Sequence, residues 1–374
     1  MQIRRLRLQQ FRNAQSADYQ FQEGLIFITG ANGSGKTTIL EAIGLLSFLK
    51  SFRNGLDRDL IAFGASYYRV SAEFETHGTR HKIGIAYGRT EPSAALAKVY
   101  DLDGARREKS ANIIGKIATV VLSPDDLKIV AGEHQDRRKF FDLQLSLVFP
   151  LYYQSLQRYQ KALQQRSTLL RQSRTAGVEH EPLWLAIDKE LANAGFEILM
   201  RRREFFPFFE TEFSRNLSKI SREKDTWKIV YHGETRHVQS AADYLLMLQN
   251  ARKNDLKLRQ TTTGIHRDRV FFCQNGELQR EIKLIASQGQ KRSAVLAMKM
   301  AQYEHFVQKQ TLKPILLIDD VLNELDLSRR EGFIDFMRSA GQVFFTTTDL
   351  EGLKGYLGQL SAQMPVQEIR LENS

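Results

Sequence analysis

A glycine-rich stretch near the N-terminus constrains this chain more than any other feature of its sequence. Residues 30–38 read Gly-Ala-Asn-Gly-Ser-Gly-Lys-Thr-Thr and fit the pattern G-x-x-x-x-G-K-[ST] at every fixed position. Residues 25–29 before it are apolar and β-prone, and residues 39–46 after it have the apolar spacing of a helix. A strand, a glycine loop and a helix in this order predict a loop that holds phosphate groups.

This loop predicts a site for a nucleoside triphosphate and Mg²⁺. Glycine adopts backbone conformations closed to other residues, so the loop can bring its N–H groups close to a polyphosphate. Lys36 adds a positive charge near the β- and γ-phosphates, and the Thr37 hydroxyl is the expected Mg²⁺ ligand. A chance glycine-rich turn is the alternative, and the flanking patterns disfavour it. The predicted ATP contacts in the loop are Gly30, Ala31, Asn32, Gly33, Ser34, Gly35, Lys36, Thr37 and Thr38.

A second part of the site is predicted far along the chain. Residues 314–318 are apolar, and Asp319 and Asp320 follow them. Such a run is typical of a buried strand in a parallel sheet, and open α/β sheets bind ligands at the carboxyl ends of their strands. We assign Asp319 to Mg²⁺ coordination and Asp320 to polarising the attacking water, with Lys36 as the other catalytic residue. A helix N-cap or a solvated acidic pair is the alternative interpretation.

A third segment lies between these two. Ser287-Gln288-Gly289-Gln290 opens a stretch of helix-favouring residues from 294 to 303. The N-terminus of such a helix faces anions. Taken alone, the segment is better explained as an ordinary N-cap, but its place before the acidic strand favours a functional role. Residues 323–326, after that strand, form an acidic turn where we expect a subunit contact.

The composition favours a polyanionic partner. The chain has 374 residues and a net charge of +11, from 54 Lys and Arg against 43 Asp and Glu. Because phosphate contacts supply most of the affinity for DNA, this excess is compatible with sequence-neutral binding to its backbone. The single cysteine, Cys273, excludes an intrachain disulfide and a cysteine metal cluster. No apolar run is long enough to cross a bilayer, so we expect a cytoplasmic protein without a membrane partner.

Two lobes are predicted from the patterns along the chain. Residues 1–126 and 296–374 form an ATPase lobe with the glycine loop and the acidic strand, and residues 127–295 form a mainly helical lobe that carries the Ser-Gly-Gln segment. Helical patterns run from 135 to 170, with a break at Phe149-Pro150, and from 183 to 220, with an interruption near Pro207. The predicted class is α/β: a P-loop, a mixed sheet with an antiparallel subdomain and an inserted helical lobe.

The order of these motifs resembles that of ABC-type ATPase heads. Further segments extend the resemblance over essentially the whole chain to the RecF family of bacterial recombination mediators and gap-repair proteins. The segments that carry it are Phe11-Arg12-Asn13, Leu40-Glu41-Ala42-Ile43, Ser51-Phe52-Arg53, Ser123-Pro124-Asp125-Asp126-Leu127, Arg137-Arg138-Lys139-Phe140-Phe141-Asp142, Tyr159 with Leu163, Gln165-Arg166 and Leu169-Leu170, Gly264-x-His266-Arg267-Asp268, and Ser287-Gln288-Gly289-Gln290.

The resemblance implies an ATP-dependent DNA-binding protein with weak, DNA-stimulated ATPase activity. RecF-type proteins dimerise head-to-tail around two ATP molecules and act with RecO and RecR to help load RecA at single-strand gaps. By this resemblance Ser287, Gly289 and Gln290 reach the γ-phosphate held by the opposite subunit. Arg12 and Asn13 lie near the nucleotide.

Four departures and two alternatives accompany this interpretation. One departure is that the usual Q-loop glutamine is not evident near Pro124-Asp125. Transporter-type ABC proteins have Glu where Asp320 stands, so hydrolysis is expected to be slow. No switch histidine is present near Thr348. The family's Gly-Pro-His-Arg-Asp reads Gly-Ile-His-Arg-Asp at residues 264–268, which leaves the local turn geometry open. The alternatives are a RecF-like ATPase of a defence system and, less favoured, a transporter's nucleotide-binding subunit.

Overall fold

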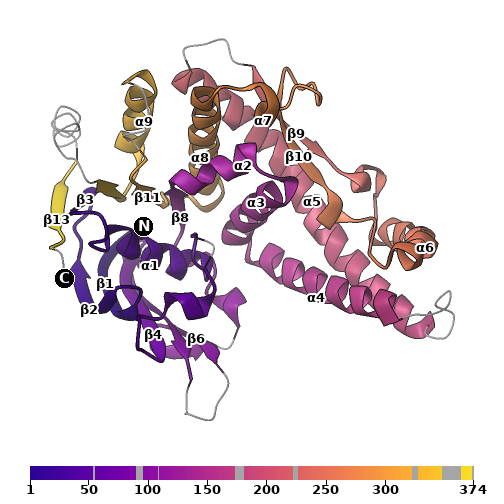
Figure 1. Ribbon diagram of the computed structural model, residues 1–374, viewed down its shortest axis with the longest axis horizontal. Helices are drawn as coiled ribbons and strands as arrows, with labels where there is room; N and C mark the ends of the chain where they lie inside the picture. Colours follow the sequence, from indigo (N-terminus) through magenta and orange to yellow (C-terminus); the bar gives the residue numbers. More distant parts are fainter. Residues whose placement is uncertain are drawn as a thin grey trace. The chain divides into compact units, whose positions relative to one another are not determined.

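The computed structural model describes residues 1–53, 55–89, 96–107, 109–172, 181–221, 226–321, 327–347 and 364–372. The chain divides into two compact units (Figure 1). The first contains Met1–Lys128, Arg215–Asp225 and Ser287–Ser374, and the second contains Ile129–Ser214 and Thr226–Ala286. The predicted turn at 323–326 and the position of Thr348 lie outside the described residues.

Thirteen strands are described, eleven of them in the first unit. They are β1 (Gln2–Phe11), β2 (Ala14–Gln20), β3 (Leu25–Thr29), β4 (Tyr67–Thr76), β5 (Thr79–Gly88), β6 (Ala97–Leu102), β7 (Ala105–Arg107), β8 (Thr119–Leu122), β11 (Ile315–Asp319), β12 (Val343–Thr347) and β13 (Val366–Arg370), with β9 (Trp227–His232) and β10 (Arg269–Gln274) in the second unit.

The strands of the first unit form two separate sheets. One is antiparallel, in the order β2-β1-β4-β5-β6-β7, and the other is parallel, in the order β13-β3-β12-β11-β8. Figure 1 shows the C-terminal β13, in yellow, beside the N-terminal β3, in indigo. The predicted antiparallel subdomain is therefore a sheet of its own.

The burial of β3, β11 and β12 agrees with their parallel pairing. Every residue of these three strands is buried, as expected for a sheet covered on both faces. The register sets Asp319 opposite Thr346, and Thr347 opposite Thr29. The carboxyl ends of the three strands therefore meet at one edge of the sheet, where the loop after β3 also begins.

Nine helices are described. They are α1 (Lys36–Phe48), α2 (Leu127–Ala131), α3 (His134–Val148), α4 (Pro150–Gln172), α5 (Glu181–Ile220), α6 (Ala241–Leu258), α7 (Ile282–Ile285), α8 (Gln288–Gln310) and α9 (Leu327–Ser339). Helix α1 is buried along nearly its whole length in the first unit. The break between α3 and α4 at Phe149 lies where the sequence predicts it.

The predicted interruption near Pro207 is wrong. Helix α5 continues through Pro207, although proline removes one helical hydrogen bond and crowds the preceding turn. The surrounding aromatic side chains are buried and pack on one another within the second unit, which offsets that local cost. They are Phe205, Phe206 and Phe209, and the buried Phe213, further along the helix, packs against Phe272 of β10.

The second unit has a core that combines apolar and ionic contacts. Trp184 packs with Leu169 and Leu170, and the fully buried Arg166 pairs with Asp188 and Asp255. The Arg166 Nε and Nη1 donate three hydrogen bonds to these two carboxylates and to Thr261, which offsets part of the cost of burying the charge, whereas its buried Nη2 has no partner among the described residues.

The unit boundary near α8 differs from the predicted lobe boundary at 295. Helix α8 is continuous from Gln288 to Gln310 and packs against β8, so its first turns belong to the same compact unit as its remainder. Residues 215–225, at the end of α5, also belong to the first unit. The division predicted from the sequence, into residues 1–126 with 296–374 and residues 127–295, stays a prediction.

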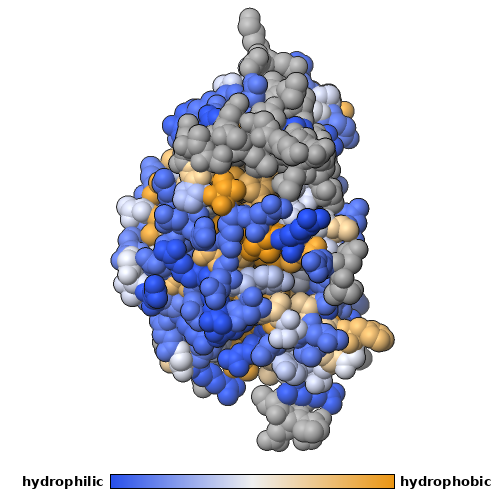
Figure 2. Space-filling view, turned by 90° about the vertical axis from the view of Figure 1, so that its left-hand side faces the viewer, coloured by the Kyte–Doolittle hydropathy of each residue, from blue (hydrophilic) through white to orange (hydrophobic). Residues whose placement is uncertain are grey.

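The molecular surface that carries β13 is mostly hydrophilic in its described part, with smaller hydrophobic patches between (Figure 2). Within the described residues, none of the helices is both long and apolar enough to span a membrane.

Candidate nucleotide site

One pocket of the first unit collects most of the residues predicted for ATP and Mg²⁺. Its volume is about 640 Å³, and it lies at the carboxyl ends of β3, β11 and β12. Predicted residues that line it are Arg12, Asn13, Asn32, Gly33, Gly35, Lys36, Thr37, Thr38, Asp319 and Asp320. Residues that line it without having been predicted as site residues are Arg53, Asp59, Ile61, Phe63 and Thr346.

The glycine loop has the conformation that its sequence requires. Gly30, Gly33 and Gly35 have φ values of 149°, 85° and 97°, which side-chain-bearing residues rarely adopt. A Cβ on Gly30 would stand 2.6 Å from the Leu371 carbonyl oxygen, so the backbone packs too closely there for any other residue.

The polar groups of this loop fit a phosphate ligand. The Lys36 Nζ donates to the Gly30 and Ala31 carbonyls at 2.7 and 2.9 Å, which keeps the ammonium folded over the loop. The Ser34 hydroxyl is buried and has no hydrogen-bond partner among the described residues. A buried polar group without a partner is costly, and a phosphate oxygen at this loop would supply one.

Thr37 and Asp319 meet at the base of the pocket. The Thr37 hydroxyl donates to Asp319 Oδ1 at 2.8 Å, and the Thr346 hydroxyl donates to the same oxygen at 2.9 Å. One hydroxyl and one carboxylate are oxygen ligands of the type that Mg²⁺ takes beside phosphates. The described residues contain no group of three or more His, Cys, Asp or Glu side chains that could hold a metal. Mg²⁺ at nucleotide sites usually takes one or two protein ligands together with phosphate oxygens and water.

Asp320 has an unusual backbone. Its φ is 50°, in the left-handed region, and its N–H donates to Thr346 Oγ1 at 3.1 Å. Aspartate and asparagine adopt this region more readily than other non-glycine residues. The bond to Thr346 fixes the turn that follows β11, which directs the chain at Asp320 into the pocket.

Arg12 is held rigidly beside the loop. Its guanidinium makes two hydrogen bonds to Glu41, at 2.8 and 2.6 Å, and a third to the Asp59 carbonyl at 3.0 Å. Glu41 is fully buried and also accepts from Ser51. The hydrogen bonds to Glu41 raise the pKa of Arg12 above its ordinary value, so its charge is permanent.

The Asn13 side chain forms hydrogen bonds with two residues of the glycine loop. Its Oδ1 accepts from Thr38 at 2.8 Å, and its Nδ2 donates to the Gly33 carbonyl at 3.3 Å. A Cβ on Gly35 would stand 3.0 Å from that Nδ2, so the glycine permits the close approach. Asn13 therefore positions the loop rather than only lining the pocket.

The Ser287 segment does not line this pocket. Ser287 is the N-cap of α8, where its hydroxyl accepts from the Gln290 N–H and the Gln290 side chain accepts from the Ser287 N–H. A Cβ on Gly289 would stand 3.0 Å from the Arg329 guanidinium, which also donates to Ser293 at 2.6 Å. Glycine at 289 therefore leaves room for a residue of α9.

The Gly-Ile-His-Arg-Asp departure has a local explanation in the second unit. The Ile265 N–H donates to the Tyr244 hydroxyl at 2.9 Å, a bond that proline at this position could not make. His266 Nδ1 lies 2.7 Å from the Tyr159 hydroxyl, and burial lowers the pKa of His266 to about 4. His266 is therefore a neutral, structural residue.

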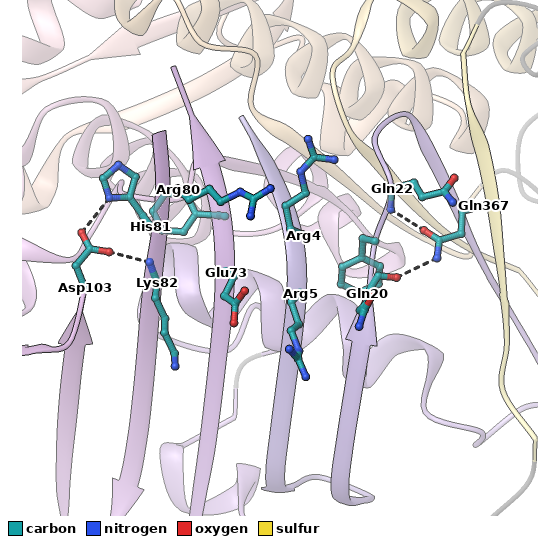
Figure 3. Close-up of a pocket in the computed structure, with 12 residues that line it drawn as sticks. Arg4, Arg5, Gln20, Gln22, Glu73, Arg80, His81, Lys82, Asp103 and Gln367 are labelled. Atoms are coloured by element: carbon teal, nitrogen blue, oxygen red, sulfur yellow. Dashed lines mark hydrogen bonds and ion pairs between the residues drawn. The ribbon is translucent and has the colours of Figure 1, made fainter. Parts of the chain in front are cut away.

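A larger cleft of about 870 Å³ lies elsewhere in the first unit (Figure 3). Its side chains come mainly from the antiparallel sheet, and the Arg80 side chain extends toward Arg4. Arg4 pairs with Glu75 at 3.2 Å, and Arg5 pairs with Asp18 at 2.6 Å, so part of its positive charge is compensated. None of the residues predicted for ATP or Mg²⁺ lines this cleft.

The fold and the pocket together define a class of protein. A glycine loop between β3 and α1, with an aspartate at the end of a neighbouring parallel strand and an antiparallel sheet alongside, is the head of an ABC-type ATPase. The family model described as "RecF/RecN/SMC N terminal domain" matches residues 2–364. The chain belongs to the RecF family within this class.

Relatives and solved structures agree with this assignment. The DNA replication and repair protein RecF of Leptospira interrogans serogroup Icterohaemorrhagiae serovar Lai (strain 56601) is 39% identical over 370 residues, which cover 99% of this chain and 98% of that protein. RecF of Streptococcus suis (strain 05ZYH33) is 34% identical, with 94% of each chain covered.

A solved structure described as the recombination mediator protein RecF-ATP in the RecFOR pathway has a TM-score of 0.82 and 29% identity, covering 93% of this chain and 92% of that chain. An SMC head bound to the C-winged helix domain of ScpA has a TM-score of 0.53 and 17% identity, covering 99% of this chain and 95% of that chain, and is similar in fold alone.

Proposed function

We propose that this protein is an ATP-dependent DNA-binding protein of gap repair, which closes as a dimer on DNA when ATP is bound. The observation that carries the proposal is the Thr37–Asp319 contact beside the glycine loop, in a pocket that the Ser287 segment does not line. A second copy of the chain would supply Ser287, Gly289 and Gln290 to the γ-phosphate. The related RecF-ATP structure and the names of the relatives support this proposal.

Each residue of the pocket has a proposed task. The loop N–H groups and Lys36 bind the phosphates, and Thr37 and Asp319 would hold Mg²⁺, which would supply positive charge beside the phosphates. Arg12, Asn13 and the remaining loop residues fix the nucleotide's position. Asp320 accepts a proton from the water that attacks the γ-phosphorus, while the bond from this phosphorus to the β-phosphate oxygen breaks and ADP leaves. Because the Asp320 carboxylate stands on a shorter side chain than that of glutamate, we propose that the ATPase activity is weak. We also propose, from the family resemblance, that DNA stimulates this activity.

The proposal includes the partners that the family implies. Double-stranded, gapped or junction DNA is the substrate, bound without sequence preference, and RecO and RecR are the protein partners with which the dimer assists RecA loading. The names of the relatives, which describe DNA replication and repair, support the DNA substrate. A cytoplasmic location belongs to the same proposal, since the substrate is bacterial chromosomal DNA.

The test compares Lys36→Ala with the full wild-type chain. Loss of one charged hydrogen-bond donor to phosphate predicts ATP affinity between about 10-fold and about 150-fold weaker, measured by calorimetry with Mg²⁺. ATP should raise the affinity for gapped DNA in wild type and not in the variant. Lys116→Ala, at an exposed lysine of the first unit, is the matched control. The proposal fails if wild type gains no DNA affinity from ATP.

A further inference from the structure

Phe63 exposes more of its side chain than any other large hydrophobic residue that the structure describes. Its relative exposure is 107%, against 70% for the next, Leu284. Phe63 lines the same pocket as Lys36 and Asp319. Covering this apolar ring with a flat ligand group would be favourable, because it removes apolar surface from water.

The backbone presents this ring in a fixed position. The Ala65 N–H donates to the Ala62 carbonyl at 3.0 Å, and Gly64 has φ of 80°. These features define a four-residue turn with Phe63 in its second position and the required glycine in its third, which turns the Phe63 side chain outward.

The turn is anchored to β1 on one side. The Ala62 N–H donates to the Gln10 carbonyl at 2.8 Å, and the Arg12 N–H donates to the Leu60 carbonyl at 2.8 Å. An isolated antiparallel bridge joins Phe11 to Ile61. The Phe63 ring and the Arg12 guanidinium are therefore both held by the pairing of residues 10–12 with residues 60–62. A ligand that contacts both side chains meets a backbone that is already ordered, which lowers the entropic cost of binding.

We propose that the Phe63 ring stacks on the base of the nucleotide whose triphosphate lies on the glycine loop. This inference rests on the proposed function, since it places the other end of the same ligand. The loop and Lys36 contact only the phosphates, whereas a purine base has two flat π-faces that stack on an aromatic ring. Phe63 and Ile61 provide that surface within the pocket.

The chemistry of stacking limits what this contact can select. Every base has a π-face, so an aromatic ring binds bases without distinguishing them strongly. Phe63 would therefore contribute affinity for nucleoside triphosphates in general, and GTP should lose affinity together with ATP when the ring is removed.

The experiment separates the base from the phosphates. Calorimetry on the full chain with Mg²⁺ compares ATP with inorganic tripolyphosphate for wild type, Phe63→Ala, Phe63→Leu and Phe63→Tyr. Because loss of a base–aromatic stack weakens binding by between about 5-fold and about 150-fold, Phe63→Ala should lose ATP affinity in this range. Tripolyphosphate affinity should not change. Phe63→Tyr should bind ATP with the affinity of wild type. The ATP affinity of Phe63→Leu should lie between those of wild type and Phe63→Ala.

Several results would overturn this role. ATP affinity that is unchanged in Phe63→Ala excludes the stack. An equal loss for ATP and tripolyphosphate means that the loop itself has been damaged. Unchanged ATP affinity with weaker ATP-driven dimerisation means that the ring contacts a second copy of the chain instead.

Two controls complete the design. Leu246→Ala removes another exposed apolar side chain, on α6 of the second unit, and should leave both affinities unchanged. If wild type binds neither ATP nor tripolyphosphate, the proposed function fails and the stack fails with it, whereas wild-type binding with no effect of Phe63→Ala overturns the stack alone.

Discussion

At the scale of single residues, the strained backbone of the pocket lies at Asp320, the residue proposed to activate water. Asp320 occupies a left-handed backbone conformation held by Thr346, directly after the aspartate that contacts Thr37. Such conformations persist where surrounding structure determines them, and they often occur at functional sites. The backbone thus places a second carboxylate beside the first without extending the strand.

Asp320→Asn isolates the proposed proton acceptor. Asparagine adopts the same left-handed region and is nearly isosteric, so the fold and ATP affinity should be retained. Turnover should fall by roughly 10²-fold or more, since a general base contributes that much. Steady-state phosphate release and calorimetric ATP binding measure the two effects. Hydrolysis at the wild-type rate would show that Asp320 does not activate the water.

His266 makes the second unit sensitive to acid. Its pKa is lowered to about 4 by burial, from an ordinary value of 6.5. Between these values the unfolded chain binds a proton that the folded chain does not, so the free energy of unfolding decreases as the pH falls from about 6.5 to about 4. The loss attributable to His266 is of the order of 3 kcal/mol.

The two tryptophans, Trp184 and Trp227, both lie in the second unit and are buried, so their fluorescence reports its unfolding. Urea midpoints measured from pH 7 to pH 4 should fall less steeply for His266→Gln than for wild type. His237→Gln, at an exposed histidine of the same unit, is the control. Parallel pH profiles for wild type and His266→Gln would contradict the assignment.

At the scale of elements, Ser287 and the N-terminus of α8 carry the proposed contact to a second subunit. Ser287→Arg places a long cation where that contact would form. We expect ATP binding by the monomer to be kept and ATP-driven dimerisation to be lost, because a bulky charged side chain is a repulsive element at an interface. Analytical ultracentrifugation with and without ATP measures this.

Ser240→Arg is a matched control for the lost N-cap. Ser240 caps α6 in the same manner, with its hydroxyl accepting from the Asp243 N–H at 3.1 Å. Both substitutions should cost roughly 1 kcal/mol of helix capping. If Ser240→Arg prevents dimerisation as strongly as Ser287→Arg, the effect comes from destabilisation and not from an interface at α8.

The sequence predicts those elements whose local signals agree with their tertiary setting. The strand–loop–helix at residues 25–48 and the apolar run ending at Asp319 are found where expected, because burial of both faces imposes an apolar run on a parallel strand. The predicted interruption at Pro207 is wrong because packing of the neighbouring aromatic side chains outweighs the local tendency of proline to end a helix.

The remainder of the pocket could not be predicted because it depends on contacts across the fold. Phe63 looks ordinary in sequence, and only the turn at Gly64 and the bridge to β1 bring it to the nucleotide pocket. The Glu41 carboxylate that orients Arg12 likewise comes from 29 residues away. The turn sequence around Gly64 was the one local signal that could have drawn attention to Phe63.

At the scale of the whole molecule, the net charge of +11 predicts how DNA binding responds to salt. Phosphate contacts release counterions, so the logarithm of the binding constant should fall linearly with the logarithm of salt concentration, by about 0.9 for each phosphate neutralised. Fluorescence anisotropy with two gapped duplexes of unrelated sequence should give equal affinities and equal slopes. Affinity that depends on sequence and not on salt would contradict backbone recognition.

In the proposed function, the candidate nucleotide pocket and the Ser287 segment form one site only when two copies of the chain meet. Light scattering measures the molar mass of the full chain alone, with ATP and Mg²⁺, and with gapped DNA added. We predict that the mass doubles with ATP, that gapped DNA favours this dimer, and that Lys36→Ala remains unchanged in mass. A wild-type mass that ATP and gapped DNA leave unaltered would contradict the central claim.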